Sequence, residues 1–174
     1  MKIFVTVFLL LVLSIVSFAQ KTETMTIKLY FLNEKMNPNL EDCTDVKPVS
    51  RKIPKTKAVA QAALEELFKG ITPEEAKNGF VSFTPEETKG ILKSIKIKNK
   101  VAYVNFNKNV YEQMGTATTS CGGGFFSSIE KTLLEFPTIK KVFYAIEENP
   151  ADFYEWVQVG ECPKELKNCS GKDF

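Results

Sequence analysis

The stretch ILKSIKIKNKVAYVNF, residues 91–106, consists of two short segments in which apolar and polar residues alternate. Such alternation is typical of strands with one buried face and one face in water. The alternating apolar residues are Leu92, Ile95 and Ile97 in the first segment and Ala102, Val104 and Phe106 in the second. The segments meet at Asn99-Lys100, so the stretch predicts a β-hairpin with one wet face, although its turn lacks the Asn-Gly pair most typical of such loops.

The segments on either side of this hairpin each predict one strand and one helix. Before it, residues 25–32 alternate like a strand, and the run KAVAQAALEELFK at 57–69 has the spacing of an amphipathic helix. After it, the apolar residues between 125 and 136 recur at helical spacing, and residues 139–147 alternate again. Residues 33–50 predict a long loop, with an extended piece at 46–53. A capping box at Thr72 predicts a further brief helical turn.

The resulting order is strand, helix, strand, strand, helix, strand, which predicts an α+β fold with a mainly antiparallel sheet and two helices packed on one face. The length of 174 residues and 44% hydrophobic content suffice for one domain with its own core. We place this domain at residues 20–148. Residues 149–174, with Trp156 and two cysteines, form a C-terminal tail.

Residues 1–19 have the pattern of a signal peptide. Lys2 supplies a positive charge, an apolar run follows from Ile3 to Val16, and small residues precede a cleavage site after Ala19. The apolar stretch is also close to the shortest length that spans a bilayer, so an uncleaved membrane anchor is the alternative. Both interpretations place the domain outside the cytoplasm, secreted or associated with the cell envelope.

The residue types argue against several functions. The 23 Lys+Arg and 21 Asp+Glu residues nearly balance and the lysines are dispersed, so nothing predicts nucleic-acid binding. The sequence contains no histidine, which removes the Ser-His-Asp and Cys-His mechanisms and the commonest metal ligand. Adjacent glutamate pairs are better explained as solvated faces than as catalytic pairs, because neighbours on a helix point in different directions. We expect no catalytic, cofactor-binding or metal-binding residues.

The four cysteines predict a disulfide-stapled fold. All of them follow the signal segment, where an oxidising compartment favours disulfides, and four cysteines allow three pairings. Cys162 and Cys169 are near enough in the chain to close a short loop, which would leave Cys43 to pair with Cys121.

The stretch TTSCGGGFFSS, residues 118–128, places Cys121 and three glycines ahead of the second predicted helix. A thiol there can be an activated nucleophile, and a glycine-rich turn there can bind phosphate. The stretch lacks the Walker lysine, so we favour a structural role in which Ser120 caps the helix and Cys121 is disulfide-bonded. The glycines then predict close backbone approach, either to the tail that carries Trp156 or to a partner.

Several of these segments resemble the GerMN domain, a family named for sporulation and spore germination proteins. The resemblance is carried by IKLYFLN at 27–33, AVAQAALEELFKG at 58–70, FTPEETKGILKSIKIKNKVAYVNF at 83–106 and TLLEFPTIKKVFYAI at 132–146. It implies an α/β module of cell-envelope proteins with no known catalytic residues. Similar single-domain members also have an Asp-Cys before the first helix and a cysteine before the second, which implies that Cys43 pairs with Cys121.

These observations predict a non-catalytic, exported binding or assembly module. Its expected partner is an envelope protein or a cell-wall component, and a homo-oligomer is a further candidate assembly. Tyr154 and Trp156 are candidates for an interaction surface, since amphipathic aromatic residues favour interfaces. Two alternatives remain open: a small exported thiol-redox or hydrolytic enzyme that uses Cys121, and a secreted inhibitor or effector that acts through Trp156 and the tail.

Overall fold

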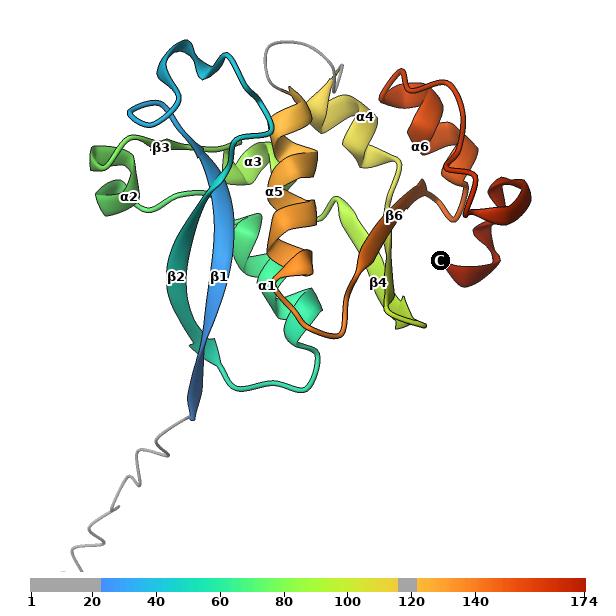
Figure 1. The fold of residues 1–174 in the computed structure, drawn as a ribbon, viewed down its shortest axis with the longest axis horizontal. Coiled ribbons are helices and arrows are strands. Elements are labelled where there is room, and N and C mark those ends of the chain that lie inside the picture. Colours follow the sequence, from blue (N-terminus) through green and yellow to red (C-terminus); the bar gives the residue numbers. More distant parts are fainter. Residues whose placement is uncertain (1–22, 116–121) are drawn as a thin grey trace, which may run out of the picture.

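The computed structural model describes residues 23–115 and 122–174, which form two small sheets with helices between and around them (Figure 1). The predicted signal peptide at 1–19, the proposed helix cap Ser120 and Cys121 lie outside the described residues. Among the helices within these two ranges, none is long and apolar enough to cross a membrane.

The first sheet is antiparallel and is centred on the N-terminal strand. It contains β1 (Thr24–Asn33), β2 (Lys47–Pro54) and β3 (Phe80–Val81) in the order β2-β1-β3. The alternating residues Ile27, Leu29 and Phe31 of β1 are buried, as the sequence predicts. The extended piece expected inside the long loop is the strand β2.

The second sheet contains the hairpin. Its strands are β4 (Leu92–Lys98), β5 (Val101–Phe106) and β6 (Lys141–Ile146), with β4 antiparallel and β6 parallel to β5. Asn99 and Lys100 both have positive φ, 51° and 65°. These values are those of the type I′ turn, which matches the twist of the two strands, so the hairpin forms without the Asn-Gly pair.

The α+β class is confirmed, but the strands divide between two sheets instead of forming one. β2 and β3 pair with the two sides of β1. The strands of the hairpin therefore do not pair with β1, as a single sheet would require. Where β3 does not reach, the helix α5 (Gly122–Leu134) closes the edge of β1: the Thr132 hydroxyl oxygen accepts a hydrogen bond from the Tyr30 N–H at 3.1 Å. α5 therefore lies between β1 and β6 and contacts both (Figure 1).

Five further helices are described. The two predicted elements are α1 (Val59–Leu67) and α2 (Pro73–Lys77), and α2 has the expected capping box between Thr72 and Glu75. The others are α3 (Pro85–Thr88), α4 (Asn109–Met114) and α6 (Pro150–Trp156), together with the short 3₁₀ segments η1 (Pro38–Leu40), η2 (Lys167–Cys169) and η3 (Gly171–Asp173). α6 begins the segment expected only as a tail.

The hairpin does not have a continuous wet face, which corrects the sequence prediction. β5 is buried on both faces because the chain after α6 returns across the side of the sheet opposite α5. Phe174 is 2% exposed, and its ring meets Tyr103 edge-on at 5.3 Å between centroids. An ion pair between Asp173 and Lys98 holds the same segment to β4. Only β4, at the edge, keeps an exposed surface.

Gly124 explains one part of the glycine run. A Cβ at this position would lie 2.6 Å from Cδ1 of Leu32 and 3.3 Å from the Cys43 carbonyl oxygen. The glycine therefore lets α5 approach β1 closely. The close approach expected from the sequence is present, but the neighbour is β1 and its following loop instead of the tail.

Candidate binding groove

The outer edge of β4 is the most open backbone feature of the second sheet. In the order β4-β5-β6, β4 pairs with β5 alone among the described strands. A two-residue hairpin loop makes its flanking residues, Lys98 and Val101, a hydrogen-bonded pair, and bonded and non-bonded pairs alternate from there. Ile95 and Ile97 consequently fall in non-bonded pairs, so their N–H and C=O groups point away from β5.

Two adjoining hollows lie along this strand, and we call them together the edge groove. The first, of about 580 Å³, lies between α1, α3 and β4 and includes Phe68, Pro85 and Leu92 in its lining. The second, of about 400 Å³, is lined by the start of α1, by Ile97 and by the loop at Phe136 that leads into β6. Gln61 and Ile95 line both hollows, so they form one continuous depression.

The floor of the edge groove is apolar. Ile95 and Ile97 pair with Val104 and Ala102, whose side chains are fully buried on the helix-facing side of the sheet. The side chains of the two isoleucines point to the same side, but there the helices no longer cover the sheet completely. Ile97 is consequently 48% exposed. An exposed β-branched residue beside a hollow favours contact with a further apolar surface.

The rim of the edge groove carries charges of both signs, and two of its four lysines are paired with carboxylates outside the rim. Its cations are Lys57, Lys69, Lys89 and Lys93, and its anions are Glu65 and Glu86. Lys93 donates hydrogen bonds to the Glu147 and Glu148 carboxylates, which raises the pKa of Lys93 above its ordinary value. Lys69 likewise forms an ion pair with Glu66 at 2.6 Å, so the rim as a whole does not select the charge of a ligand.

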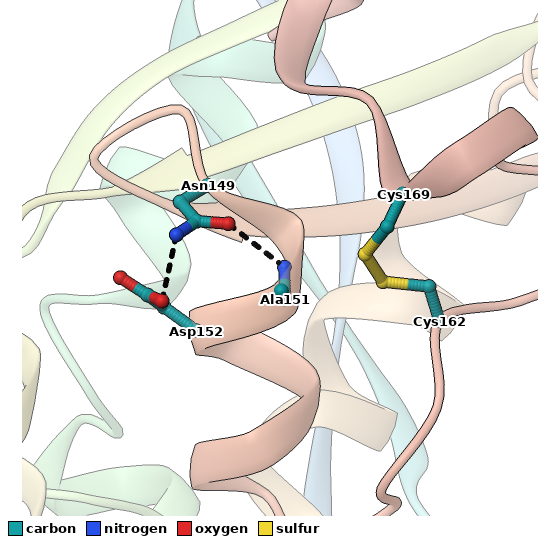
Figure 2. Close-up of a disulfide and its surroundings, with 5 residues drawn as sticks. All are labelled: Asn149, Ala151, Asp152, Cys162 and Cys169. Carbon is teal, nitrogen blue, oxygen red and sulfur yellow. Dashed lines mark hydrogen bonds between the residues drawn. A yellow bond between two sulfur atoms is a disulfide. The ribbon is translucent and has the colours of Figure 1, made fainter.

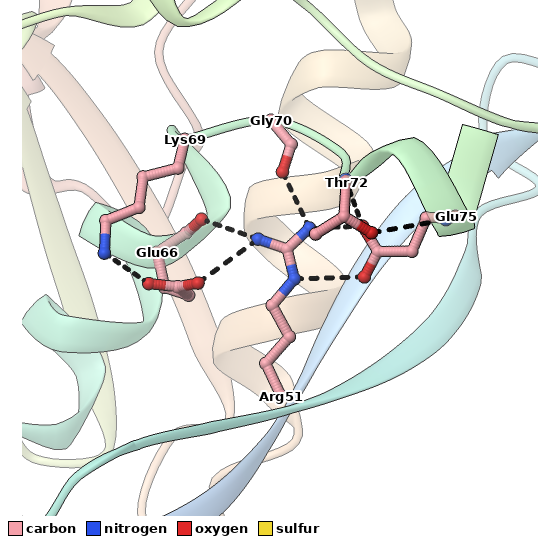
Figure 3. A network of polar contacts seen from close by, with 6 residues as sticks. All are labelled: Arg51, Glu66, Lys69, Gly70, Thr72 and Glu75. Carbon is pink, nitrogen blue, oxygen red and sulfur yellow. Dashed lines mark hydrogen bonds and ion pairs between the residues drawn. The ribbon is translucent and has the colours of Figure 1, made fainter.

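The wall formed by α1 is fixed by Arg51 of β2 (Figure 3). Its Nε and Nη2 atoms donate to the two carboxylate oxygens of Glu75 at 3.0 and 2.5 Å, and Nη2 also donates to the Gly70 carbonyl at 2.7 Å. Nη1 contacts the Glu66 carboxylate at 3.3 Å. One guanidinium group thereby ties β2 to the end of α1 and the start of α2, so the groove is bounded by a rigid element.

The predicted disulfide near the C-terminus is present. Cys162 and Cys169 are bonded, with their Cα atoms 5.6 Å apart. Figure 2 shows this bond beside the start of α6, where the Asn149 side chain accepts a hydrogen bond from the Ala151 N–H at 3.1 Å. Cys43 is also disulfide-bonded. Its pairing with Cys121 stays a prediction, because Cys121 lies outside the described residues.

Tyr154 and Trp156 lie away from the edge groove, in an aromatic cluster around α6. The side chain of Tyr154 is buried, and burial raises its pKa to about 12. Trp156 packs edge-on against Tyr111 and Phe126, and its indole N–H donates to the Gly115 carbonyl at 2.9 Å. Tyr154 thus has little surface to offer a partner, and Trp156 is largely engaged in joining α6 to α4 and α5.

Sequence reasoning did not find the edge groove. The alternation of isoleucine and lysine in β4 predicts a strand, but it does not indicate whether that strand lies at an edge. That position follows from the parallel pairing of β6 with β5, which uses the other side of β5. The available signal was the strand KSIKIK itself, because lysines are common on strands that lie at sheet edges.

The described residues define a small α+β module whose most open feature is a groove along a strand edge. The family described as "Germane: Sporulation and spore germination" matches residues 28–152. The chain belongs to this family, which confirms the GerMN resemblance. The segment after residue 152, which contains most of α6 and the Cys162–Cys169 disulfide, lies beyond the matched region.

A solved structure shares the fold. The tandem GerMN domains of the sporulation protein GerM from Bacillus subtilis are 24% identical, with a TM-score of 0.51, and the match covers 73% of this chain. The chain spans only 40% of that tandem structure. The first GerMN domain of the same protein is 20% identical over 71% of this chain and 83% of that domain, with a TM-score of 0.43. A comparison with curated proteins gives no match.

Proposed function

We propose that the chain is a non-catalytic, exported module that binds a protein partner of the cell envelope through the edge groove. The observation that carries this proposal is the coincidence of a free strand edge, exposed Ile97 and a continuous hollow on one side of the molecule. An apolar hollow with a charged rim is the usual composition of a protein-binding surface.

The chemistry of the groove supports binding over catalysis. Its polar lining consists of lysine, glutamate, glutamine, serine and threonine side chains, and the sequence has no histidine to serve as a general base. Tyr30 and Tyr154 do not supply a general base either. Burial raises the pKa of Tyr154 to about 12, and burial together with Glu135 raises the pKa of Tyr30 to about 12. Membership of the GerMN family points in the same direction.

Export is supported by the signal-like segment at 1–19 and by the Cys162–Cys169 disulfide, since disulfides persist in oxidising compartments. By its family, the process served is related to sporulation or spore germination. The sporulation protein GerM contains two GerMN domains in tandem, whereas the match here covers one region.

Site-specific photocrosslinking in intact cells tests the proposed surface. A photoreactive phenylalanine analogue replaces Gln61 or Ile97 in the groove, and a matched variant carries it at Lys52, which is exposed on β2 in the other sheet. We expect discrete crosslinked products from the groove positions and not from position 52. Equal crosslinking at all three positions, or none in the groove, would reject the edge groove as the binding surface.

The alternative enzyme that uses Cys121 makes a different prediction. It needs a free thiol, whereas a binding module stapled by two disulfides has none. Mass spectrometry of the oxidised chain after alkylation is expected to show no modified cysteine and a crosslinked peptide pair that joins Cys43 to Cys121. Alkylation of Cys121 in the active, oxidised protein would favour the enzyme.

A further inference from the structure

The free edge of β4 presents two different faces to an incoming chain. On the side of the edge groove lie the apolar side chains of Ile95 and Ile97. On the opposite side lie Lys96, which pairs with Tyr103, and Lys98, which forms an ion pair with Asp173. Because successive side chains in a strand point to opposite faces, an added strand would meet apolar residues and lysines in alternation.

The charge of β4 argues against a second copy of this chain as the occupant. The strand LKSIKIK contains three lysines and no acidic residue. Two copies paired through β4 would bring lysines of both strands together, Lys96 above all because Lys93 and Lys98 have carboxylate partners, and like charges on facing positions are destabilising. The outer strand of the other sheet, β2, is also basic and contains Pro48 and Pro54, which cannot donate to a ladder.

Lysines on an edge strand block pairing with neutral or basic strands, but they leave the edge open to an acidic one. The rim of the edge groove adds little to this preference, because Lys69 and Lys93 are already paired with Glu66, Glu147 and Glu148; the preference for an acidic segment therefore comes from Lys96 on the strand itself. The apolar side chains of Ile95 and Ile97 on the floor of the edge groove favour apolar residues at the alternate positions of the bound segment. Both observations select the same kind of segment.

We propose that β4 binds an extended segment of a partner protein in which acidic and apolar residues alternate, added as a fourth strand to the sheet. This inference rests on the proposed function and specifies the partner chemistry of the same surface. The backbone N–H and C=O groups of Ile95 and Ile97 would form the ladder. The apolar side chains of the segment would enter the edge groove, and its carboxylates would face Lys96 on the other side.

A synthetic peptide tests this directly with the oxidised mature chain. The probe is a short capped peptide of alternating glutamate and valine, labelled for fluorescence anisotropy. We expect saturable binding that weakens with added salt, and slower hydrogen exchange of the Ile95 and Ile97 amides by at least about tenfold at saturation. A lysine-valine peptide, and a glutamate-valine peptide N-methylated at alternate residues, are expected not to bind, because one reverses the charge and the other removes ladder donors.

Two matched variants separate the edge from general electrostatics. Lys96→Glu is expected to weaken the glutamate-valine peptide about tenfold, through the change from an attractive to a repulsive pair. Lys52→Glu makes the same change of net charge on the other sheet and is expected to leave the affinity within about twofold. Equal effects of the two variants, binding of the N-methylated peptide, or exchange protection away from β4 would each overturn strand addition.

The crosslinking and peptide experiments distinguish a failure of the proposed function from a failure of strand addition. If the groove positions crosslink in cells but the peptide does not protect β4, the binding surface stands and strand addition is wrong. If the groove positions give no crosslinks, the proposed function fails whatever the peptide does.

Discussion

Arg51 shows how one side chain determines the position of several elements. Its side chain is 9% exposed, and it contacts Glu75, Glu66 and the Gly70 carbonyl while its guanidinium carbon lies 5.4 Å from the centre of the Phe31 ring. A charge that is this deeply buried is tolerated only with partners, because the free-energy cost of removing it from water is offset by its ion pairs and hydrogen bonds. The same dependence applies to the glutamates.

Replacing Arg51 with alanine is expected to lower the free energy of unfolding by about 2–3 kcal/mol, because Glu75 loses its cationic partner and Glu66 keeps only Lys69, while both carboxylates remain mostly shielded from water. Urea unfolding followed by circular dichroism measures the change. Lys52→Ala, an exposed neighbour in β2, serves as the control and is expected to stay within about 0.5 kcal/mol. Similar values for the two variants would show that the network does not stabilise the fold.

The same network predicts a pH dependence. Burial raises the pKa of Glu75, but hydrogen bonds from Arg51 and Thr72 outweigh burial, so the net pKa lies below the ordinary value of 4.5. A lowered pKa in the folded state means that the unfolded state binds more protons below about pH 4.5, so this contribution is complete above that pH and is lost as the pH falls through the folded pKa.

Unfolding experiments between neutral pH and pH 3 are therefore expected to show a decline in stability below about pH 4.5 that is shallower in Glu75→Gln, because glutamine does not titrate. Parallel declines in the two proteins would contradict a contribution from Glu75.

At the scale of elements, α5 holds the two sheets together, and its first turn is shaped by Gly124. Alanine favours a helix over glycine by about 1 kcal/mol, but here a Cβ would overlap Leu32 of β1. Overpacking of a core contact costs about 1–3 kcal/mol. The packing cost is expected to exceed the gain in helix propensity.

Gly124→Ala should therefore destabilise the protein by about 1 kcal/mol, and trimming the neighbour with Leu32→Val should recover part of this loss. A double-mutant cycle by urea unfolding provides the measurement. Strictly additive effects of the two substitutions would mean that the close approach of α5 to β1 is not what the glycine provides.

The local elements could be predicted because their signals are local. The alternation in residues 91–106 predicts the hairpin, and the sequence Thr72-Pro73-Glu74-Glu75 predicts the N-terminal cap of α2. The same signal is present for α3 in Thr84-Pro85-Glu86-Glu87, a helix that was not among the expected elements. The division into two sheets could not be predicted, because it depends on which strands compete for the sides of β1. The edge groove, which needs β4 at an edge beside α1, is a tertiary property for the same reason.

At the scale of the whole molecule, the chain after α6 completes the core. Leu166 and Phe174 are buried although they follow the region that matches the family. A Cβ at Gly171 would overlap the Glu148 carbonyl oxygen, so the returning segment runs directly against the end of β6. This segment covers the outer face of β5 and β6, which would otherwise be exposed to water.

Phe174→Ala is expected to lower the free energy of unfolding by about 2–3 kcal/mol, because removal of the buried ring leaves a cavity beside Tyr103. Tyr103 should become more exposed, which near-ultraviolet circular dichroism and binding of a hydrophobic dye report. Val159→Ala is the control, since Val159 is 67% exposed. If both variants unfold at the same urea concentration as the parent, the returning segment is not part of the folding unit.

The hydrogen bond between Tyr30 and Thr132 spans 102 positions in the sequence. A ribosome delivers the N-terminus first, so β1 and β2 emerge long before α5 exists to cover them. During synthesis the apolar face of β1 is exposed when it emerges, and it is fully covered only when α5 has joined α1 on that strand. The nascent protein is therefore most in need of a chaperone in the interval between these two segments.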